Sequence, residues 1–408
     1  MKKVLGLVQG EYSSHTAKIV EICKALRNLG NYEIEFSGNG QFMSLAESAG
    51  FPIIQTKTLT KERINRALEK SLTPHFYSDE LVEELYKVEH TLLQKQKPDI
   101  IIRDHFREIA GISAKVHGIY DVTVQQGPAN HNYHFVFRPE TFPKWADKVF
   151  PEGSLIPIAR GIEFFVRRST SKPLHKKAKS LGLKLERKWP EGVSPDLVLL
   201  TESPLLYPNL DIENNIKYLG PMIIENDSSI PDWINEFTVD NRRKIIVTAG
   251  TTGIHDNSLL FTESLSDGRY AVAFYTNTSL PNPPKNFYGN SQFNISAVLS
   301  QADLFITHGG IGSTYRGLWN GTPMIPIHNH LEQHANTFQL EKLGVAKGIG
   351  HLSVNPQKLR QTIDDVISSI SMKQNSERVR QELHTWPVAT LLAADYIKSY
   401  GFKEYIYP

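Results

Sequence analysis

Two segments of the chain place glycine beside imidazole or hydroxyl side chains just after a predicted strand. In ADLFITHGGIGST, residues 302–314, an apolar strand leads into His308, several glycines and two hydroxyl residues. Glycines at such a turn let the backbone approach a ligand, and the free N–H groups at a helix start favour an anion. The segment TAGTTG, residues 248–253, follows another strand of the same half. Either turn could be only a tight connection, but two turns at one sheet edge predict a diphosphate site.

A third polar segment, HNHLEQHAN at residues 328–336, follows the apolar run MIPI. Glu332 and Gln333 offer a carboxylate and an amide, which suit the hydroxyl groups of a sugar. A polar segment standing alone would be interpreted as solvated surface. Its place at the same strand edge as the two glycine turns favours a sugar contact.

The elements that would position these groups alternate between apolar runs and amphipathic segments. Helices are predicted at 15–30, where Ile19, Ile22, Leu26 and Leu29 follow helical spacing, and at 106–118 and 387–401. The predicted strands span residues 2–9, 32–38, 98–104, 121–125, 195–203 and 216–222, then 243–253, 270–277, 291–296, 302–310 and 322–328. Strands that alternate with helices predict two doubly wound parallel sheets of the α/β class.

Composition narrows the class of protein further. The chain has 408 residues, of which 40% are hydrophobic and 22% charged, as in a globular protein of two domains. A net charge of +2 gives no indication of nucleic-acid binding. The single cysteine, Cys23, excludes a disulfide within the chain and is expected to be a buried thiol. The apolar run at the N-terminus is too short for a signal peptide and no transmembrane run is present, so a cytoplasmic protein is predicted.

Residues 303–350 resemble the donor-binding signature of the inverting glycosyltransferases of the UDP-glycosyltransferase superfamily. The shared pattern is a strand, H-G-G-x-G-S/T, a helix, G-x-P, a strand and D/E-Q-x-x-N. The resemblance implies the GT-B fold, in which two Rossmann-like domains face each other across a cleft. Residues 1–220 would bind the acceptor and residues 221–384 the donor, and residues 385–408 would form a helix that returns to the N-terminal domain.

The resemblance also implies the reaction. A sugar would pass from a UDP- or dTDP-sugar to a hydroxyl or similar nucleophile of a small-molecule acceptor, without a required cofactor or metal. The donor-binding residues would be Gly250, Thr251, Thr252, Phe293, Ile295, His308, Gly310, Gly312, Ser313, Thr314, Arg316, Glu332 and Gln333. Of these, Phe293 and Ile295 would frame the nucleobase.

Arg316 departs from the family pattern. Many UDP-sugar enzymes have a glutamate at this position, which accepts hydrogen bonds from the ribose hydroxyls. Arginine cannot accept a hydrogen bond. Either the donor has no 2′-hydroxyl, as in a dTDP-sugar, or Arg316 pairs with phosphate, or it is a surface residue.

His15 and Asp104 occupy the family's positions for a base and its acidic partner. His15 lies near the start of the first predicted helix, and Asp104 ends the strand predicted at 98–104. A neutral imidazole can remove a proton from the acceptor while a carboxylate orients its ring. His105, and the pair His131 and His134, are alternative histidines. No carboxylate or cysteine set completes a metal site around that pair, so no metal is predicted.

Residues 126–190 interrupt the alternation and are rich in aromatic and basic side chains. The aromatic residues between 126 and 170 are candidates to bind the acceptor. The basic segment 160–185 is interpreted as a solvated helix face, with contact to an anionic membrane surface as the less favoured alternative. Other functions left open are a lipid acceptor, a nucleotide-sugar epimerase or hydrolase of this fold, and a non-catalytic activator subunit.

Overall fold

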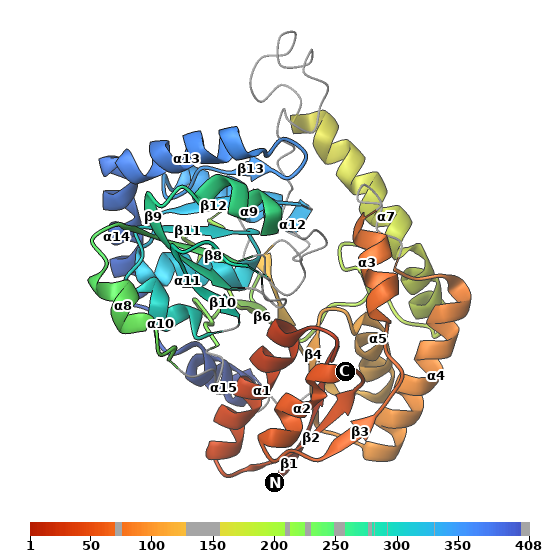
Figure 1. Ribbon diagram of the computed structural model, residues 1–408. Coiled ribbons are helices and arrows are strands. Elements are labelled where there is room, and N and C mark those ends of the chain that lie inside the picture. The colour runs from red at the N-terminus through yellow and green to blue at the C-terminus, as the bar shows by residue number, and fades with distance from the viewer. Residues whose placement is uncertain are drawn as a thin grey trace. The chain divides into compact units, whose positions relative to one another are not determined.

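The chain is divided into two compact units. The computed structural model describes residues 1–69, 76–127, 156–208, 213–224, 230–248, 258–275, 280, 282–291, 293–329 and 331–400. The first unit contains Met1–Met222 and Pro387–Pro408, and the second contains Ile223–Trp386 (Figure 1). Each unit is built around one parallel β-sheet, which confirms the predicted α/β class.

The sheet of the first unit has the strand order β3-β2-β1-β4-β5-β6-β7, and each neighbouring pair is parallel. Its strands are β1 (Lys2–Leu7), β2 (Tyr32–Gly38), β3 (Ile53–Gln55), β4 (Ile100–Asp104), β5 (Tyr120–Gln125), β6 (Leu197–Leu200) and β7 (Ile216–Tyr218). The order reverses direction beside β1 and β4. In open α/β sheets, ligands bind outside the carboxyl ends of the strands at such a point.

Helices cover both faces of this sheet. They are α1 (Ser13–Asn28), α2 (Ser44–Ser48), α3 (Lys61–Glu69), α4 (Asp79–Gln96), α5 (Glu108–His117), α7 (Ile156–Ser180) and α15 (Ala389–Tyr400), with a short 3₁₀ turn at Gln41–Met43. α1 and α15 share a core with one face of the sheet, while α4 and α5 pack on the other face. The C-terminal helix α15 therefore packs beside α1, in the same unit as the N-terminus (Figure 1).

Helix α1 follows the predicted pattern except at its end. Ile19, Ile22 and Leu26 are buried, and Cys23 lies among them as a buried thiol. Leu29 was expected on the same face, but its side chain is 44% exposed. The helix ends at Asn28 and Leu29 is its C-cap, so the helical spacing no longer directs that side chain into the core.

The sheet of the second unit has the order β10-β9-β8-β11-β12-β13, again with parallel neighbours. Its strands are β8 (Arg243–Thr248), β9 (Tyr270–Tyr275), β10 (Phe287–Ser291), β11 (Leu304–Thr307), β12 (Met324–His328) and β13 (Ile349–Gly350). Its helices are α8 (Ile234–Val239), α9 (Ser258–Leu265), α10 (Ile295–Leu299), α11 (Ile311–Asn320), α12 (Leu331–Lys342), α13 (Pro356–Ser368) and α14 (Ile370–Leu383).

The strand predicted at residues 291–296 is wrong. The strand β10 ends at Ser291, and Asn294 already caps α10 by accepting a hydrogen bond from the N–H of Ala297 at 3.1 Å. An asparagine that caps a helix holds the chain in a turn at this point, which the local apolar pattern does not reveal.

Residues 160–180 of the basic segment form most of α7, whose C-terminal part packs on α4. Leu174 is buried there. Lys176 and Lys177 form ion pairs with Asp79 at 2.5 Å and with Glu83 at 2.7 Å. These two lysines therefore already have carboxylate partners within the unit. Among the described residues, no helix has both the length and the apolar character needed to cross a membrane.

Candidate functional site

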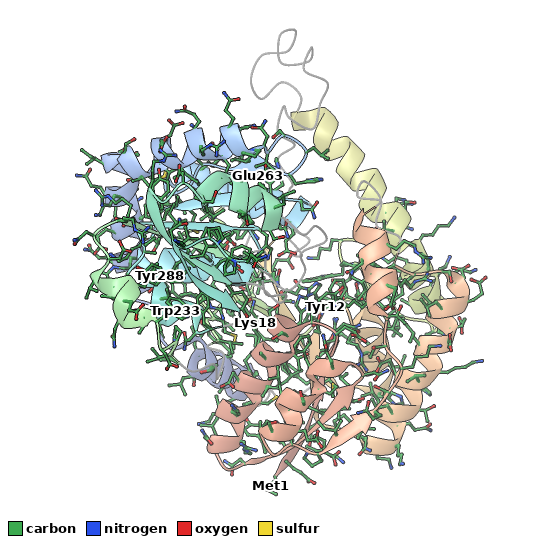
Figure 2. The ribbon with its side chains drawn as sticks, viewed as in Figure 1. Met1, Tyr12, Lys18, Trp233, Glu263 and Tyr288 are labelled. Atoms are coloured by element: carbon green, nitrogen blue, oxygen red, sulfur yellow. The ribbon has the colours of Figure 1, made fainter. Side chains whose placement is uncertain are left out.

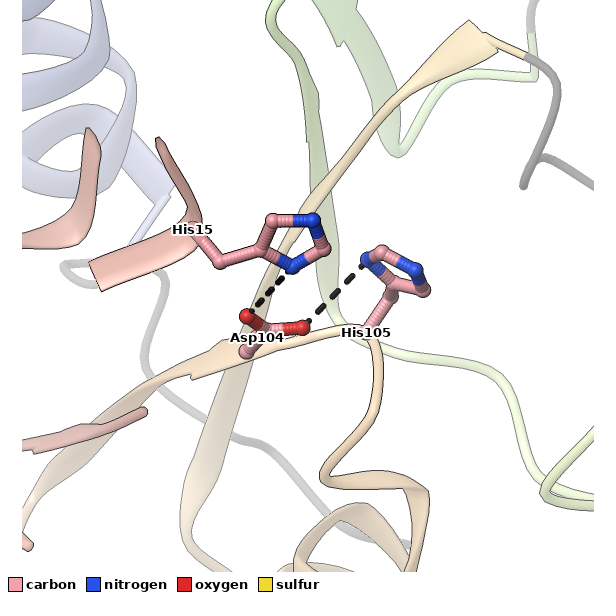
Figure 3. Close-up of side chains that lie close together, drawn as sticks. All are labelled: His15, Asp104 and His105. Carbon is pink, nitrogen blue, oxygen red and sulfur yellow. Dashed lines mark hydrogen bonds and ion pairs between the residues drawn. The ribbon is translucent and has the colours of Figure 1, made fainter. Parts of the chain in front are cut away.

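The structure brings His15 and Asp104 together at the carboxyl edge of the first sheet. His15 lies in the first turn of α1, and Asp104 is the last residue of β4. Nδ1 of His15 is 2.9 Å from Oδ2 of Asp104 (Figure 3). The His15 side chain is 14% exposed and that of Asp104 only 2%. Asp104 is thus enclosed, while His15 remains partly open to an incoming molecule.

A second histidine faces the other oxygen of the same carboxylate. Nδ1 of His105 is 3.4 Å from Oδ1 of Asp104, and the two imidazole rings have centroids 5.1 Å apart. Figure 3 shows the carboxylate held between the two rings. The N–H of Phe106 also donates to Oδ1 of Asp104, at 2.9 Å. His105, the predicted alternative base, therefore also lies against Asp104.

These contacts set the charge on Asp104. Burial alone would raise the pKa of its carboxyl group, but the interactions with His15 and His105 and the N–H of Phe106 bring that pKa to about 2. Asp104 is therefore a carboxylate throughout the neutral range. Burial lowers the pKa of His105 to about 4, with Asp104 opposing that shift, so His105 is neutral at pH 7.

Aromatic side chains surround His15. The ring of Phe106 stacks on it at 5.6 Å with an interplanar angle of 13°, and Tyr12 lies 5.5 Å away. Phe76 meets the edge of Phe106 at 5.6 Å. The hydroxyl of Tyr12, which is labelled in Figure 2, donates to Oδ1 of Asn65 at 2.9 Å. The base is thus flanked by flat apolar surfaces.

Buried ion pairs hold the end of β4, which carries Asp104, and the connection from β4 to α5. Arg103 is fully buried and binds both oxygens of Asp121, at 2.8 and 3.1 Å, and Oε1 of Glu191 at 2.7 Å. Arg107 donates to Glu89 at 2.7 Å and to the carbonyl of Val8 at 3.0 Å. These residues were not among the predicted site residues. A charged residue inside an apolar strand is the signal that could have found Arg103 and Asp121.

Glu108 is a further carboxyl group near these ion pairs, and it is neutral. It forms a short hydrogen bond with the hydroxyl of Tyr77, which also lies 3.2 Å from the carbonyl of Phe106. Burial and the charge of Glu191 raise the pKa of Glu108 to about 8, although the Tyr77 bond opposes the shift. Glu108 is therefore protonated at neutral pH and adds no negative charge beside the connection from β4 to α5.

In the second unit, the glycine segment forms the predicted turn from β11 to α11. Gly309 has a φ of +78°, a backbone conformation that favours glycine, and Gly310 is the N-cap of α11. A Cβ atom on Gly310 would lie 2.4 Å from Nε2 of His308, so the imidazole of His308 rests directly over this turn. The helix start has no side-chain cap. Its first N–H groups have no partner within the helix and can bind an anion.

The other predicted residues of this turn differ in burial. Gly312 and Ser313 are half-buried in the first turn of α11, whereas Thr314 is fully buried. The N–H of Thr314 donates to the carbonyl of Gly310 at 2.9 Å, which is the first hydrogen bond of the helix. The hydroxyl of Thr314 is enclosed, without a hydrogen-bond partner among the described residues.

The start of α12 stabilises the same turn. Asn336 is fully buried, and its side-chain amide donates to the carbonyl of Gly309 at 2.9 Å. Gln333 is 3% exposed, and its side-chain oxygen accepts from the N–H of Asn329 at 2.8 Å. Glu332 is half-buried in the first turn. The sequence prediction missed Asn336, although it ends the D/E-Q-x-x-N pattern and could have been found there.

Arg316 has a defined partner within the second unit. Its Nη2 donates to the carbonyl of Ile224 at 2.6 Å. Burial raises the pKa of the Tyr275 phenol, and the charge of Arg316 partly opposes that shift. Arg316 is therefore half-buried against the chain that enters the unit, and is not a free surface arginine.

An aromatic cluster lies around the predicted nucleobase residues. Phe293 is 3% exposed and meets the edge of Trp233 at 5.1 Å and of Tyr275 at 5.4 Å. Ile295 is half-buried at the start of α10. The ring centroids of Trp233 and Tyr288, both labelled in Figure 2, lie 6.4 Å apart in the same cluster. Phe293 is thus mainly a packing residue of this cluster, while Trp233 is only half-buried.

Several predicted residues lie outside the part of the chain that the structure describes. They are Gly250, Thr251 and Thr252 of the second glycine turn, the histidines His131 and His134, and most of the aromatic segment 126–170. Their roles stay predictions.

Comparisons with known proteins agree with this architecture. Residues 275–398 match the family described as erythromycin biosynthesis protein CIII-like, C-terminal domain. The chain is similar to a PGL/p-HBAD biosynthesis glycosyltransferase of Mycobacterium tuberculosis, with 22% identity over 386 residues, covering 93% of this chain and 88% of the relative.

Two solved structures share the fold over nearly the whole chain. The spinosyn forosaminyltransferase matches with a TM-score of 0.71 and 16% identity, covering 98% of this chain and 99% of that structure. The spinosyn rhamnosyltransferase complexed with thymidine diphosphate matches with a TM-score of 0.69 and 13% identity, covering 97% and 99%. Together with the two parallel sheets and the glycine turn, these similarities identify the chain as a UDP-glycosyltransferase-like glycosyltransferase of the GT-B fold.

Proposed function

We propose that the chain is an inverting glycosyltransferase that moves a sugar from a nucleoside diphosphate sugar to a hydroxyl of a natural-product or glycolipid acceptor. The observation that carries this proposal is the 2.9 Å contact between Nδ1 of His15 and Asp104. A carboxylate can only accept, so Nδ1 carries the hydrogen and Nε2 keeps its lone pair. Among the described residues, no hydrogen bond occupies that Nε2 atom. His15 is therefore prepared to act as a base.

In the proposed reaction, Nε2 of His15 takes the proton of the acceptor hydroxyl. The acceptor oxygen forms a bond to the anomeric carbon as the bond from that carbon to the diphosphate oxygen breaks. Because the attack comes from the face opposite the diphosphate, the anomeric configuration inverts. The imidazolium that forms is stabilised by Asp104, whose lowered pKa keeps it ionised.

The leaving nucleoside diphosphate would be bound by the second unit. The uncapped start of α11, its helix dipole and the imidazole of His308 over Gly310 provide donors for the diphosphate charge without a metal ion. Gly312 and Ser313 continue this surface, whereas Thr314 is fully buried, and Glu332 would contact the transferred sugar. The thymidine diphosphate in the similar rhamnosyltransferase structure supports a nucleotide donor.

The donor would be a dTDP-sugar rather than a UDP-sugar. Arg316 is bound to the carbonyl of Ile224 at 2.6 Å, and as a cation it offers no acceptor for a ribose 2′-hydroxyl. A deoxyribose has no such hydroxyl to satisfy. Since Arg316 already has a backbone partner, a phosphate contact is the less favoured role for it.

The acceptor would present a flat or apolar surface next to its reacting hydroxyl. Tyr12 and Phe106 flank His15 with their rings 5.5 and 5.6 Å from the imidazole. Burial of such a surface stabilises binding and excludes water from the base. The similarity to a PGL/p-HBAD biosynthesis glycosyltransferase and to a spinosyn forosaminyltransferase supports a natural-product or glycolipid acceptor.

The test is to incubate the enzyme with UDP- and dTDP-sugars in the presence and absence of a panel of aromatic and macrolide alcohols. We expect a β-linked glycoside from an α-linked donor, together with one nucleoside diphosphate for each glycoside formed. A sugar epimer or free sugar from donor alone would instead indicate the epimerase or hydrolase. Full inactivity that is reversed by adding a second transferase would indicate an activator subunit.

A further inference from the structure

The proposed reaction uses one imidazole and one carboxylate, yet the structure places a second imidazole on the same carboxylate. His15 and His105 direct Nδ1 atoms at the two oxygens of Asp104, at 2.9 and 3.4 Å. Their side chains are 14% and 19% exposed, so small solutes can reach both rings. His105 therefore needs an explanation that base catalysis alone does not give.

The separations of these atoms suit a transition-metal ion. Zinc binds nitrogen and carboxylate oxygen at about 2.0 to 2.2 Å, which puts two tetrahedral ligands about 3.4 Å apart. Nδ1 of His105 is at that distance from Oδ1 of Asp104, 3.4 Å, whereas Nδ1 of His15 is hydrogen-bonded to the other oxygen, Oδ2, at 2.9 Å, so a bound zinc ion would replace that hydrogen bond. One ligand atom from each of the three residues lies within 4.8 Å of the others, so a modest rotation of the imidazole rings would complete the geometry.

The ligand types point to the same class of ion. Two imidazoles and one carboxylate are a common set for zinc and leave a fourth position open to water. Other histidine pairs occur, such as His90 with His117 at 3.0 Å, but within the described ranges only this cluster brings three ligand groups together. We propose that His15, Asp104 and His105 form a binding site for Zn²⁺.

A zinc ion bound at this site would prevent His15 from acting as a base. When zinc bonds to Nδ1 of His15, the hydrogen of the neutral imidazole must be on Nε2, because one imidazole nitrogen cannot carry both. Nε2 then has no lone pair for the acceptor proton. This inhibitory consequence rests on the proposed transferase function, whereas zinc binding itself does not.

The experiment titrates ZnCl₂ into metal-free full-length protein by calorimetry, with Co²⁺ absorption spectra as a second readout. We expect one tight zinc per chain and the intense visible bands of four-coordinate Co²⁺. His105→Gln keeps a side chain that can donate to Asp104 but has no imidazole, and should weaken zinc binding at least about tenfold. The matched control His117→Gln removes another half-exposed histidine and should bind zinc like the wild type.

Equal zinc affinity in wild type and His105→Gln would overturn the proposal, as would the absence of a stoichiometric site in the wild type. If His105→Gln does not fold, the imidazole proton NMR signals of the wild type can be followed during zinc addition. The signals of two histidines should shift together if the site binds zinc, and no histidine signal should shift if it does not. Zinc should also inhibit sugar transfer, and a chelator should restore it. Should no donor support transfer, the calorimetric result still tests the metal site independently.

Discussion

The candidate sites of the two units are formed by different kinds of groups. At the edge of the first sheet, the candidate site is formed by charged and polar side chains. Asp104 is enclosed between two imidazoles, and buried ion pairs of Arg103 hold the strand that carries it. At the edge of the second sheet, the backbone dominates. There, Gly309 and Gly310 expose a helix start, and Asn336 fixes the turn through a carbonyl.

The difference follows from what each proposed step requires. Proton transfer needs one atom with a suitable lone pair at a fixed position, which only an oriented side chain provides. A diphosphate spreads its charge over many oxygens, and several N–H groups with a helix dipole match that distribution. Substitutions in the first unit should therefore affect the rate, and those in the second unit should affect donor affinity.

The largest expected effect is on the rate. His15→Ala removes the base and should lower transfer by about 10²- to 10⁴-fold at saturating donor. Asp104→Asn keeps the shape but removes the charge that stabilises the imidazolium, so it should lower the rate less completely. Steady-state product formation measures both, and a His15→Ala enzyme with wild-type turnover would show that another histidine is the base.

A smaller effect is expected at the glycine turn. Gly310→Ala puts a Cβ atom 2.4 Å from Nε2 of His308, so the imidazole must move off the turn. Loss of its hydrogen bond to a charged phosphate should weaken donor binding about 10- to 100-fold.

Gly312→Ala is the matched control, since its Cβ would meet Arg316 only at 3.7 Å. It should keep the free protein intact and weaken donor binding less than Gly310→Ala does. The reverse order, measured by calorimetric titration of a nucleoside diphosphate, would argue against His308 as a phosphate ligand.

The smallest effect concerns nucleotide choice. With Arg316 in place, thymidine diphosphate should bind at least as tightly as uridine diphosphate. Arg316→Glu provides an acceptor for the ribose and should shift the ratio toward uridine diphosphate by up to about tenfold, or 1.4 kcal/mol. If both nucleotides instead weaken together, Arg316 contacts phosphate. A wild-type preference for uridine diphosphate of about tenfold or more would exclude the dTDP-sugar proposal.

The sequence predicted the elements that carry the sites because periodicity and turn residues are local signals. The segment 32–38 coincides with β2, and the glycines after β11 mark the turn to α11. The pairing of His15 with Asp104 was implied by the family resemblance. Strand order allows it, since β1 and β4 are neighbours, Asp104 ends β4 and His15 lies in the first turn of the helix that follows β1.

What the sequence could not predict depends on contacts between distant segments. Arg316 meets the carbonyl of Ile224, which lies 92 positions earlier, and no pattern around Arg316 indicates this. Asn336 reaches Gly309 across the turn in the same way. His105 was recognised as an alternative base, but its position on the second oxygen of Asp104 depends on the geometry of the turn into α5.

The most direct test of this division of roles is one calorimetric comparison of nucleoside diphosphate binding by the wild type, His15→Ala and His308→Ala. We expect His15→Ala to bind thymidine diphosphate like the wild type. We expect His308→Ala to bind it more weakly by about 1.5 to 3 kcal/mol, the range for hydrogen bonds to charged groups. Unchanged binding by His308→Ala, or a comparable loss in His15→Ala, would contradict the separation of base and donor site between the two units.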